Sequence, residues 1–152
     1  MKIKALLSLF LFTSLLTFSQ ESENKTYDEK LAKELGADDY GMKKYVIAFL
    51  KKGPNRDRTP EESAKLQRGH LDNIVRMANE GLLVLAGPFL DNGELRGIYV
   101  FNVETVEEAK KLTETDPAIQ AGSLVMELHP WYGTAALPML KEYYDKIAKT
   151  KI

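Results

Sequence analysis

His70 is a residue of this sequence that could carry out acid–base chemistry, and Asp116 is its candidate partner. A histidine acts as a general base when a partner orients one ring nitrogen and leaves the other free toward a substrate. A carboxylate is a suitable partner, and Asp116 directly precedes Pro117 at the end of a predicted helix. The pair could therefore take a proton from a small molecule.

Each residue also has an explanation that needs no chemistry. His70 lies four residues before Ile74, at the edge of a buried helical stripe, where a histidine is often a boundary residue. Asp116 can cap the short turn that Pro117 begins and Gly122 ends. On the residues alone, we favour these structural explanations over a catalytic pair.

Two further candidate residues lie at the end of the last predicted strand. By alternation His129 shares a face with Val125 and Glu127, which places it either toward an interface or cavity or at an exposed strand end. We expect Trp131 to be a packing residue whose indole nitrogen finds a partner near the rim of the fold.

A polar loop before the long predicted helix carries Arg56 and Arg58. The two guanidinium groups could attract an anionic ligand, or the loop could act as a lid over a site. The third alternative is a solvated loop without a role in binding, which we favour because connecting segments usually face water.

The composition argues against several kinds of site. The sequence has no cysteine, so thiolate chemistry and disulfides are excluded, and two histidines argue against a His-rich zinc site. It contains no Gly-rich phosphate loop after a strand and no Gly-x-Ser-x-Gly elbow. The formal net charge of −1 gives no reason to expect nucleic acid. We expect a small-molecule ligand, and no metal, cofactor or nucleic acid.

The first nineteen residues have the pattern of a cleavable secretory signal peptide. Lys2 and Lys4 precede an apolar run over residues 5–16, and the small residues Thr17 and Ser19 follow. We predict cleavage before Gln20, which removes two lysines and changes the formal charge from −1 to −3. The protein would then be periplasmic or secreted, without stable membrane insertion. The alternative is an uncleaved anchor, although spanning a bilayer takes roughly twenty apolar residues.

Capping signals and periodicity divide the rest of the chain into helices and strands. Gly36 ends a short N-terminal helix, capping boxes at Thr59 and Thr105 open two longer ones, and Gly81 ends the first of these. Alternating apolar residues predict four strands, over residues 43–50, 82–86, 95–103 and 123–129. The predicted divisions are a signal peptide, a linker with a short helix, one domain and a C-terminal helix: residues 1–19, 20–42, 43–133 and 134–152.

The predicted core order is strand-helix-strand-strand-helix-strand, which is a ferredoxin-like α+β fold with two helices on one face of an antiparallel sheet. Ile98 and Val100 alternate with Tyr99 and Phe101, so the other face is apolar too and must be covered. A second copy of the sheet, related by a twofold axis, would bury this face, and we predict a homodimer. The alternative is that the terminal helices cover it within one chain.

Several segments in this order and spacing resemble the YciI-like (YCII-related) family over residues 43–131. They are Arg68-Gly69-His70-Leu71, Glu80-Gly81-Leu82-Leu83 leading to Ala86-Gly87-Pro88, and Asp116-Pro117 with Ala121-Gly122 five residues on. The resemblance implies a ferredoxin-like dimeric α+β barrel, in agreement with the order of the predicted elements.

The resemblance also implies a site. Family members are described as carrying a histidine–aspartate pair in a cleft, and by motif these residues fall on His70 and Asp116. A similar domain is a dehydrochlorinase of chlorinated hydroxyquinols, which implies proton abstraction from a small cyclic substrate. Ala118 stands where an aromatic residue typically follows Asp-Pro, so the pocket wall is expected to be wider or to be shaped by Trp131. The candidate substrate-binding residues are Arg68, Gly87, Pro88, Tyr99, His129 and Trp131.

Two hypotheses for the function follow. The first is an exported enzyme in which His70, held in one tautomer by Asp116, is the general base of a dehydrochlorinase-like or lyase-like reaction. The second is a non-catalytic periplasmic module that binds a small ligand or serves in a stress response, with the pair structural or orienting the ligand. The fold alone does not choose between them, because this architecture hosts unrelated functions.

Overall fold

The computed structural model describes residues 26–150 of the chain. The predicted signal peptide and the predicted cleavage site before Gln20 lie outside the described residues. Over residues 26–150, none of the helices is both long enough and apolar enough to cross a membrane.

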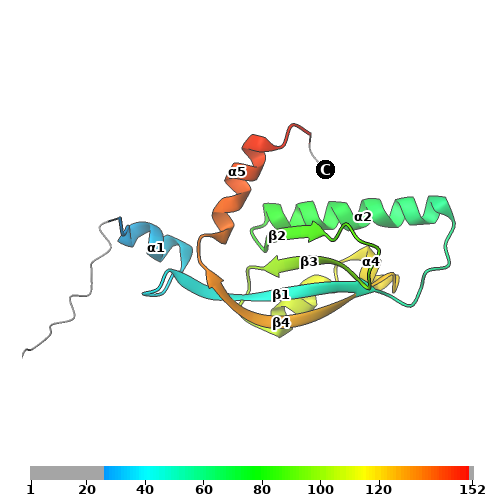
Figure 1. The fold of residues 1–152 in the computed structure, drawn as a ribbon, viewed down its shortest axis with the longest axis horizontal. Coiled ribbons are helices and arrows are strands. Elements are labelled where there is room, and N and C mark those ends of the chain that lie inside the picture. Colours follow the sequence, from blue (N-terminus) through cyan, green and yellow to red (C-terminus); the bar gives the residue numbers. More distant parts are fainter. Residues whose placement is uncertain (1–25, 151–152) are drawn as a thin grey trace, which may run out of the picture.

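The described chain forms a four-stranded antiparallel sheet with helices (Figure 1). Its elements are α1 (Glu29–Leu35), β1 (Met42–Lys52), α2 (Pro60–Asn79), β2 (Leu83–Pro88), β3 (Leu95–Phe101), α3 (Val106–Thr113), α4 (Pro117–Gln120), β4 (Leu124–Thr134), the 3₁₀ helix η1 (Leu137–Met139) and α5 (Leu140–Ile147). The order from β1 to β4 confirms the predicted ferredoxin-like α+β fold. The strands lie side by side in the order β2-β3-β1-β4, so β2 and β4 are the edges.

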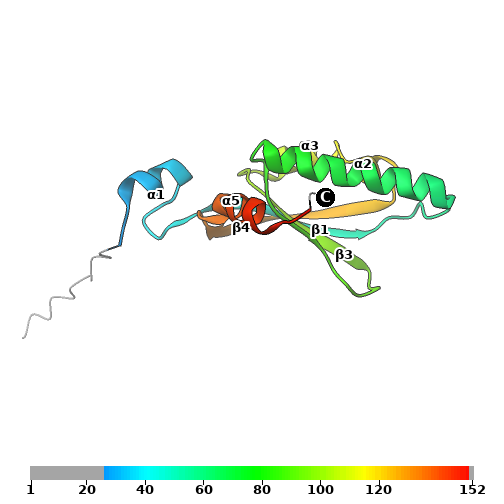
Figure 2. The same cartoon turned by 90° about the horizontal axis from the view of Figure 1, so that it is seen from above.

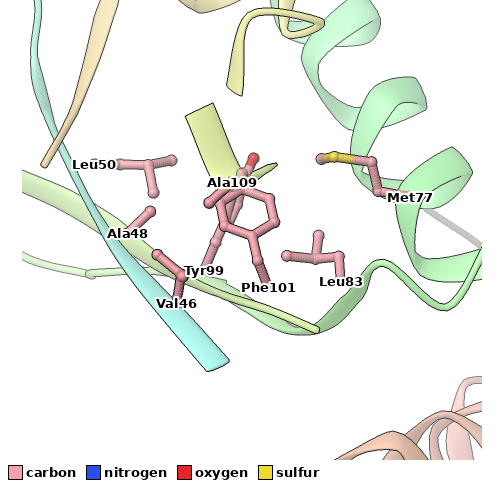
Figure 3. Close-up of a cluster of buried hydrophobic side chains, with 8 residues drawn as sticks. All are labelled: Val46, Ala48, Leu50, Met77, Leu83, Tyr99, Phe101 and Ala109. Atoms are coloured by element: carbon pink, nitrogen blue, oxygen red, sulfur yellow. The ribbon is translucent and has the colours of Figure 1, made fainter. Parts of the chain in front are cut away.

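Helices α2 and α3 lie over the same face of the sheet, as the view from above shows (Figure 2). The core between the helices and the sheet combines side chains from β1, β2, β3 and both helices (Figure 3). Its buried members are Val46, Ala48, Leu50, Met77, Leu83, Tyr99, Phe101 and Ala109. Each large apolar side chain buried here contributes about 1.5–3 kcal/mol, so this layer fixes how α2 sits on the sheet.

The start of α2 is fixed by a capping box. The Thr59 hydroxyl accepts a hydrogen bond from the Glu62 amide, and the Glu62 carboxylate accepts one from the Thr59 amide at 2.8 Å. Pro60 occupies the first helical position, where its missing amide proton is not needed. The same arrangement at Thr105 and Glu108 opens α3. These local signals fix where each helix begins, and hence which residues of α2 face the sheet.

Both edge strands extend further than the sequence predicts. The second strand is predicted to end at residue 86, yet Gly87 and Pro88 continue β2 and lie opposite Ile98 and Gly97. The last strand was expected to end at residue 129, but β4 runs through Pro130 to Thr134. A proline lacks the amide proton of an interior ladder but is tolerated on an edge strand, whose outer side needs no partner. At β3 the difference is smaller, since this strand ends at Phe101 rather than at residue 103.

The second face of the sheet remains partly uncovered. Leu85 and Val125 are 40% and 47% exposed there, and Ile47, Phe49 and Ile98 are only half-buried. The chain beyond β4 leads to η1 and α5, which contact β2 at the opposite edge, and neither α1 nor α5 has a buried residue. The terminal helices therefore do not complete the burial of this apolar face.

Candidate active site

His70 and Asp116 lie within hydrogen-bond distance although they are far apart in the sequence. His70 comes from the middle of α2, and its Nδ1 is 2.8 Å from Asp116 Oδ2. The other carboxylate oxygen accepts a hydrogen bond from the Ala118 amide at 2.8 Å and caps α4. Asp116 is fully buried. The two explanations that the sequence left open for Asp116 are thus compatible, because each uses a different oxygen.

The Asp116 carboxylate sets the tautomer of the His70 ring. A carboxylate only accepts hydrogen bonds, so the neutral imidazole carries its proton on Nδ1 and its lone pair on Nε2. Nε2 lies 3.3 Å from the Tyr99 hydroxyl, which is long for a hydrogen bond to a hydroxyl donor. The lone pair of Nε2 therefore accepts at most a weak hydrogen bond from Tyr99, and a stronger donor could replace that hydroxyl.

Tyr99 is a neutral hydrogen-bond donor in this site. Burial, and in second place the nearby Asp116 carboxylate, raises the pKa of its phenol well above the ordinary value of 10.0. Only 2% of the residue is exposed. The hydroxyl thus keeps its proton at physiological pH and can donate a hydrogen bond to His70 or to a ligand.

The Tyr99→Phe variant is expected to lose less stability than the wild type at alkaline pH. Because the pKa of the phenol is raised in the folded protein, its contribution to the free energy of unfolding is present below about pH 10 and is lost as the pH rises further. Denaturant titrations from neutral to strongly alkaline pH measure this loss. Tyr27→Phe, at an exposed tyrosine, is the matched control and should keep the wild-type dependence. Equal dependences for the two variants would contradict a protonated, buried Tyr99.

A cavity of about 470 Å³ opens beside the His70–Asp116 pair. His70 and Tyr99 line it, together with Gly87 and Pro88 of β2 and with Ala118 of α4. Its apolar walls come from Leu50, Leu66, Leu71, Ile74 and Leu124. A largely apolar hollow of about 300–1,000 Å³ with a few convergent polar groups is typical of small-molecule sites.

The structure brings some of the predicted site residues together and leaves others elsewhere. His70, Gly87, Pro88 and Tyr99 line the cavity, and Asp116 lies directly behind His70. The predicted substrate-binding residue Arg68 does not line it. Its side chain is half-exposed on α2 and forms an ion pair with Asp72 at 2.7 Å, one helical turn away.

His129 and Trp131 lie on the face of the sheet opposite the helices, away from the cavity. His129 Nε2 is 2.8 Å from Glu127 Oε1, and both side chains are exposed. The Trp131 ring packs against Tyr45, with 5.8 Å between ring centroids, and covers Gly133. Contrary to the expectation from the sequence, Trp131 does not line the cavity, whereas Ala118 does.

The cavity also contains polar residues that the sequence did not single out. Ser63 and Gln67 lie seven and three residues before His70, so helical spacing could have placed them on the same face of α2. Arg96 reaches the cavity from β3. No local pattern could have found it, because only the pairing of β3 in the sheet brings it near α2.

The loop that carries Arg56 and Arg58 is held against the connection between α4 and β4. The Asn55 amide donates to the Gly122 carbonyl at 3.0 Å, and Arg58 Nη2 donates to the Ala121 carbonyl at 2.6 Å. Gly53 allows this close approach, because a Cβ at that position would collide with the Gly122 carbonyl. The loop is tied down along its length, which does not fit the alternative of a lid.

The donor set of the site is not that of a metal centre. Among residues 26–150, no group of three or more histidine, aspartate or glutamate side chains lies close enough to hold a metal ion. The polar groups around the cavity include the Tyr99 hydroxyl and the guanidinium group of Arg96, which donate hydrogen bonds rather than ligate a metal ion. The arrangement suits the binding of a small molecule and the transfer of a proton to His70.

The sequence places this chain in a family. The YCII-related domain matches residues 44–132, more than half of the chain, and the protein belongs to the YCII-related family. It is similar to the uncharacterized protein YjpA of Bacillus subtilis (strain 168), with 30% identity over 74 residues, which is 49% of this chain and 85% of that protein.

One solved structure shows a weaker likeness. It is the 5-chloro-2-hydroxyhydroquinone dehydrochlorinase TftG from Burkholderia phenoliruptrix, in complex with 2,5-dihydroxybenzoquinone. The identity is 17% and the TM-score is 0.43, over 57% of this chain and 92% of TftG. A likeness at this level does not transfer chemistry from one protein to the other.

Proposed function

We propose that this protein is an enzyme in which His70 takes a proton from a small polar or cyclic substrate in the cavity. The proposal rests on one observation, the 2.8 Å contact between Nδ1 of His70, a residue that lines the cavity, and the fully buried Asp116 carboxylate. This is the arrangement that a general base needs, with one nitrogen oriented and the other available.

The proposed step moves one proton. A substrate hydroxyl or acidic C–H group displaces the weak contact between Tyr99 and His70, and its proton passes to Nε2 while the electron pair stays on the substrate. The imidazolium that forms is stabilised by the Asp116 carboxylate, and the Tyr99 hydroxyl can then donate to the substrate anion. A lyase-like reaction, such as loss of a halide, would follow from this anion.

The alternative is a non-catalytic module that binds a small ligand. The contact of 3.3 Å between the Tyr99 hydroxyl and His70 Nε2 favours it, because both ring nitrogens then have partners within the protein. In that case the chain from Asp116 through His70 to Tyr99 would hold α4, α2 and β3 together.

Exchange of substrate protons with solvent deuterium separates the two functions. We expect the wild type to accelerate deuterium uptake by members of a panel of cyclic ketones and hydroxylated aromatic compounds, followed by NMR. His70→Asn should lose about a hundred- to ten-thousand-fold of this acceleration. Arg76→Gln, at an arginine that does not line the cavity, is the control and should retain it. No acceleration with any compound would contradict the enzyme and favour the module.

We also propose that two copies assemble through the face of the sheet opposite α2 and α3. The support is the apolar surface that remains there, with Leu85 and Val125 more than one third exposed. A second copy of the same face would bury it on both chains at once.

Export is a further proposal, supported by the basic and apolar pattern of the first nineteen residues. Expression of the full chain in a Gram-negative host, followed by fractionation and N-terminal sequencing, tests it. We expect a periplasmic or secreted product that begins near Gln20. A product that retains Lys2 and Lys4 in the cytoplasmic fraction would rule out the signal peptide.

A further inference from the structure

Three arginines line the cavity beside His70. Arg56 and Arg58 come from the loop before α2, and Arg96 comes from β3. No aspartate or glutamate of the described chain is among the lining residues, and Asp116 is buried behind the imidazole. The cavity is therefore strongly cationic in a chain whose formal net charge is −1, and such a hollow concentrates anions.

The arginines outside the cavity differ from these three because they are paired with carboxylates. The chain has five in all, and the two that do not line the cavity are ion-paired along α2. Arg68 lies 2.7 Å from Asp72, and Arg76 lies 2.6 Å from Glu80. Pairing with an acidic residue one turn on is the usual state of an exposed helical arginine.

The cavity arginines have no such carboxylate partner within residues 26–150, and hydrogen-bond instead to backbone carbonyl oxygens. The acceptors are Ser123 for Arg56, Asn55 and Ala121 for Arg58, and Asp91 for Arg96. A guanidinium group has five donors, so most of them remain available. The positive charges are held in place but not neutralised, which leaves them for a ligand.

The shape and chemistry of the cavity narrow the class of ligand. A planar guanidinium fork matches a carboxylate, which it can bind through two parallel hydrogen bonds. The lining also includes the apolar side chains of Leu50, Ile74 and Leu124, which would contact a hydrocarbon or ring. A ligand that satisfies both the arginines and these apolar side chains has an acid group on a compact apolar body.

We propose that the cavity binds a small organic carboxylate, with its acid group at Arg56, Arg58 and Arg96 and its apolar body against Leu50, Ile74 and Leu124. This inference names the substrate class of the proposed enzyme and, in its catalytic part, rests on that proposal. The carboxylate would anchor the molecule at the arginines, while the hydroxyl or acidic C–H group that loses its proton lies near His70 Nε2.

The test compares carboxylates with amides of the same shape. Acetate, benzoate and phenylacetate are titrated into the protein, each beside its neutral amide, and binding is followed by calorimetry and by the His70 ring signals. We expect at least one carboxylate to bind about tenfold or more tightly than its amide. Arg96→Gln should weaken that carboxylate about tenfold or more and leave the amide unchanged, because it removes charge-assisted hydrogen bonds.

Arg76→Gln is the matched control, since it removes the same charge from an arginine outside the cavity and should leave binding unchanged. Failure of all three carboxylates to bind the wild type would overturn the inference. Equal affinity for a carboxylate and its amide, or equal effects of Arg96→Gln and Arg76→Gln, would overturn it as well.

The test of carboxylate binding can be distinguished from the test of the proposed enzyme. His70→Asn should retain carboxylate binding and lose deuterium exchange. If the carboxylate results hold and the wild type shows no exchange with the panel or with the carboxylates that bind, the enzyme proposal is wrong and the arginine-lined cavity is the ligand site of a binding module. If the wild type accelerates deuterium exchange but binds none of the carboxylates, the assignment of His70 as the general base stands and the proposed substrate class is wrong.

Discussion

Replacing Asp116 with alanine is expected to lower the free energy of unfolding by about 2–4 kcal/mol, because two buried hydrogen bonds disappear together. The cap of α4 at the Ala118 amide is lost, and the Nδ1 proton of His70 is left without its acceptor. For a domain of this size the midpoint of thermal unfolding should fall by roughly 10 °C. Denaturant and thermal unfolding of the purified variant measure the loss.

Two other substitutions sharpen this result. Asp72→Ala removes an exposed carboxylate that is ion-paired with Arg68, and it should cost less than about 1 kcal/mol. Asp116→Asn can keep the cap through its amide oxygen, but it turns an amide donor toward His70. The ring should then move its proton to Nε2, which ¹⁵N NMR detects directly. A variant Asp116→Ala as stable as Asp72→Ala would show that the carboxylate does not hold the histidine.

The second large effect concerns assembly. Leu85→Glu is expected to convert the proposed dimer into a monomer, with a loss of affinity of about a hundredfold or more, because an unpaired charge would be buried at the interface. Leu85 is 40% exposed on the face opposite α2 and α3. Light scattering after size-exclusion chromatography at several concentrations measures the mass.

Val75→Glu is the matched control for assembly. Val75 is 38% exposed on α2, a similar fraction to Leu85, but it lies on the helical side of the molecule. This variant should remain dimeric. A wild type that is monomeric at all concentrations, or a Leu85→Glu variant that assembles like Val75→Glu, would refute the proposed interface.

The helix starts could be predicted from the sequence because their causes are local. A threonine followed three residues later by a glutamate closes a capping box wherever it occurs, as it does at Thr59 and Thr105. The strand ends could not be predicted in the same way. Whether Pro88 and Pro130 end a strand depends on whether that strand is an edge, and the edges are set by the pairing of the whole sheet.

For the candidate site too, local features could be predicted from the sequence and long-range contacts could not. Alternation correctly placed His129 with Glu127 on one face, but it did not show that this face is the one away from the helices. The contact between His70 and Asp116 spans 46 residues, and no local pattern joins them, so the resemblance to a family was needed to select the pair. Arg96 was missed because its neighbours in the cavity belong to distant segments.

The anchored loop from Gly53 to Arg58 has a consequence for the speed of binding. Its hydrogen bonds to Ala121, Gly122 and Ser123 hold the rim in one arrangement, so a ligand meets a site that is already formed. For the proposed carboxylate, association then needs no slow closing step and is aided by the arginine charges. The association rate constant should therefore fall as salt is added, while the dissociation rate constant changes little.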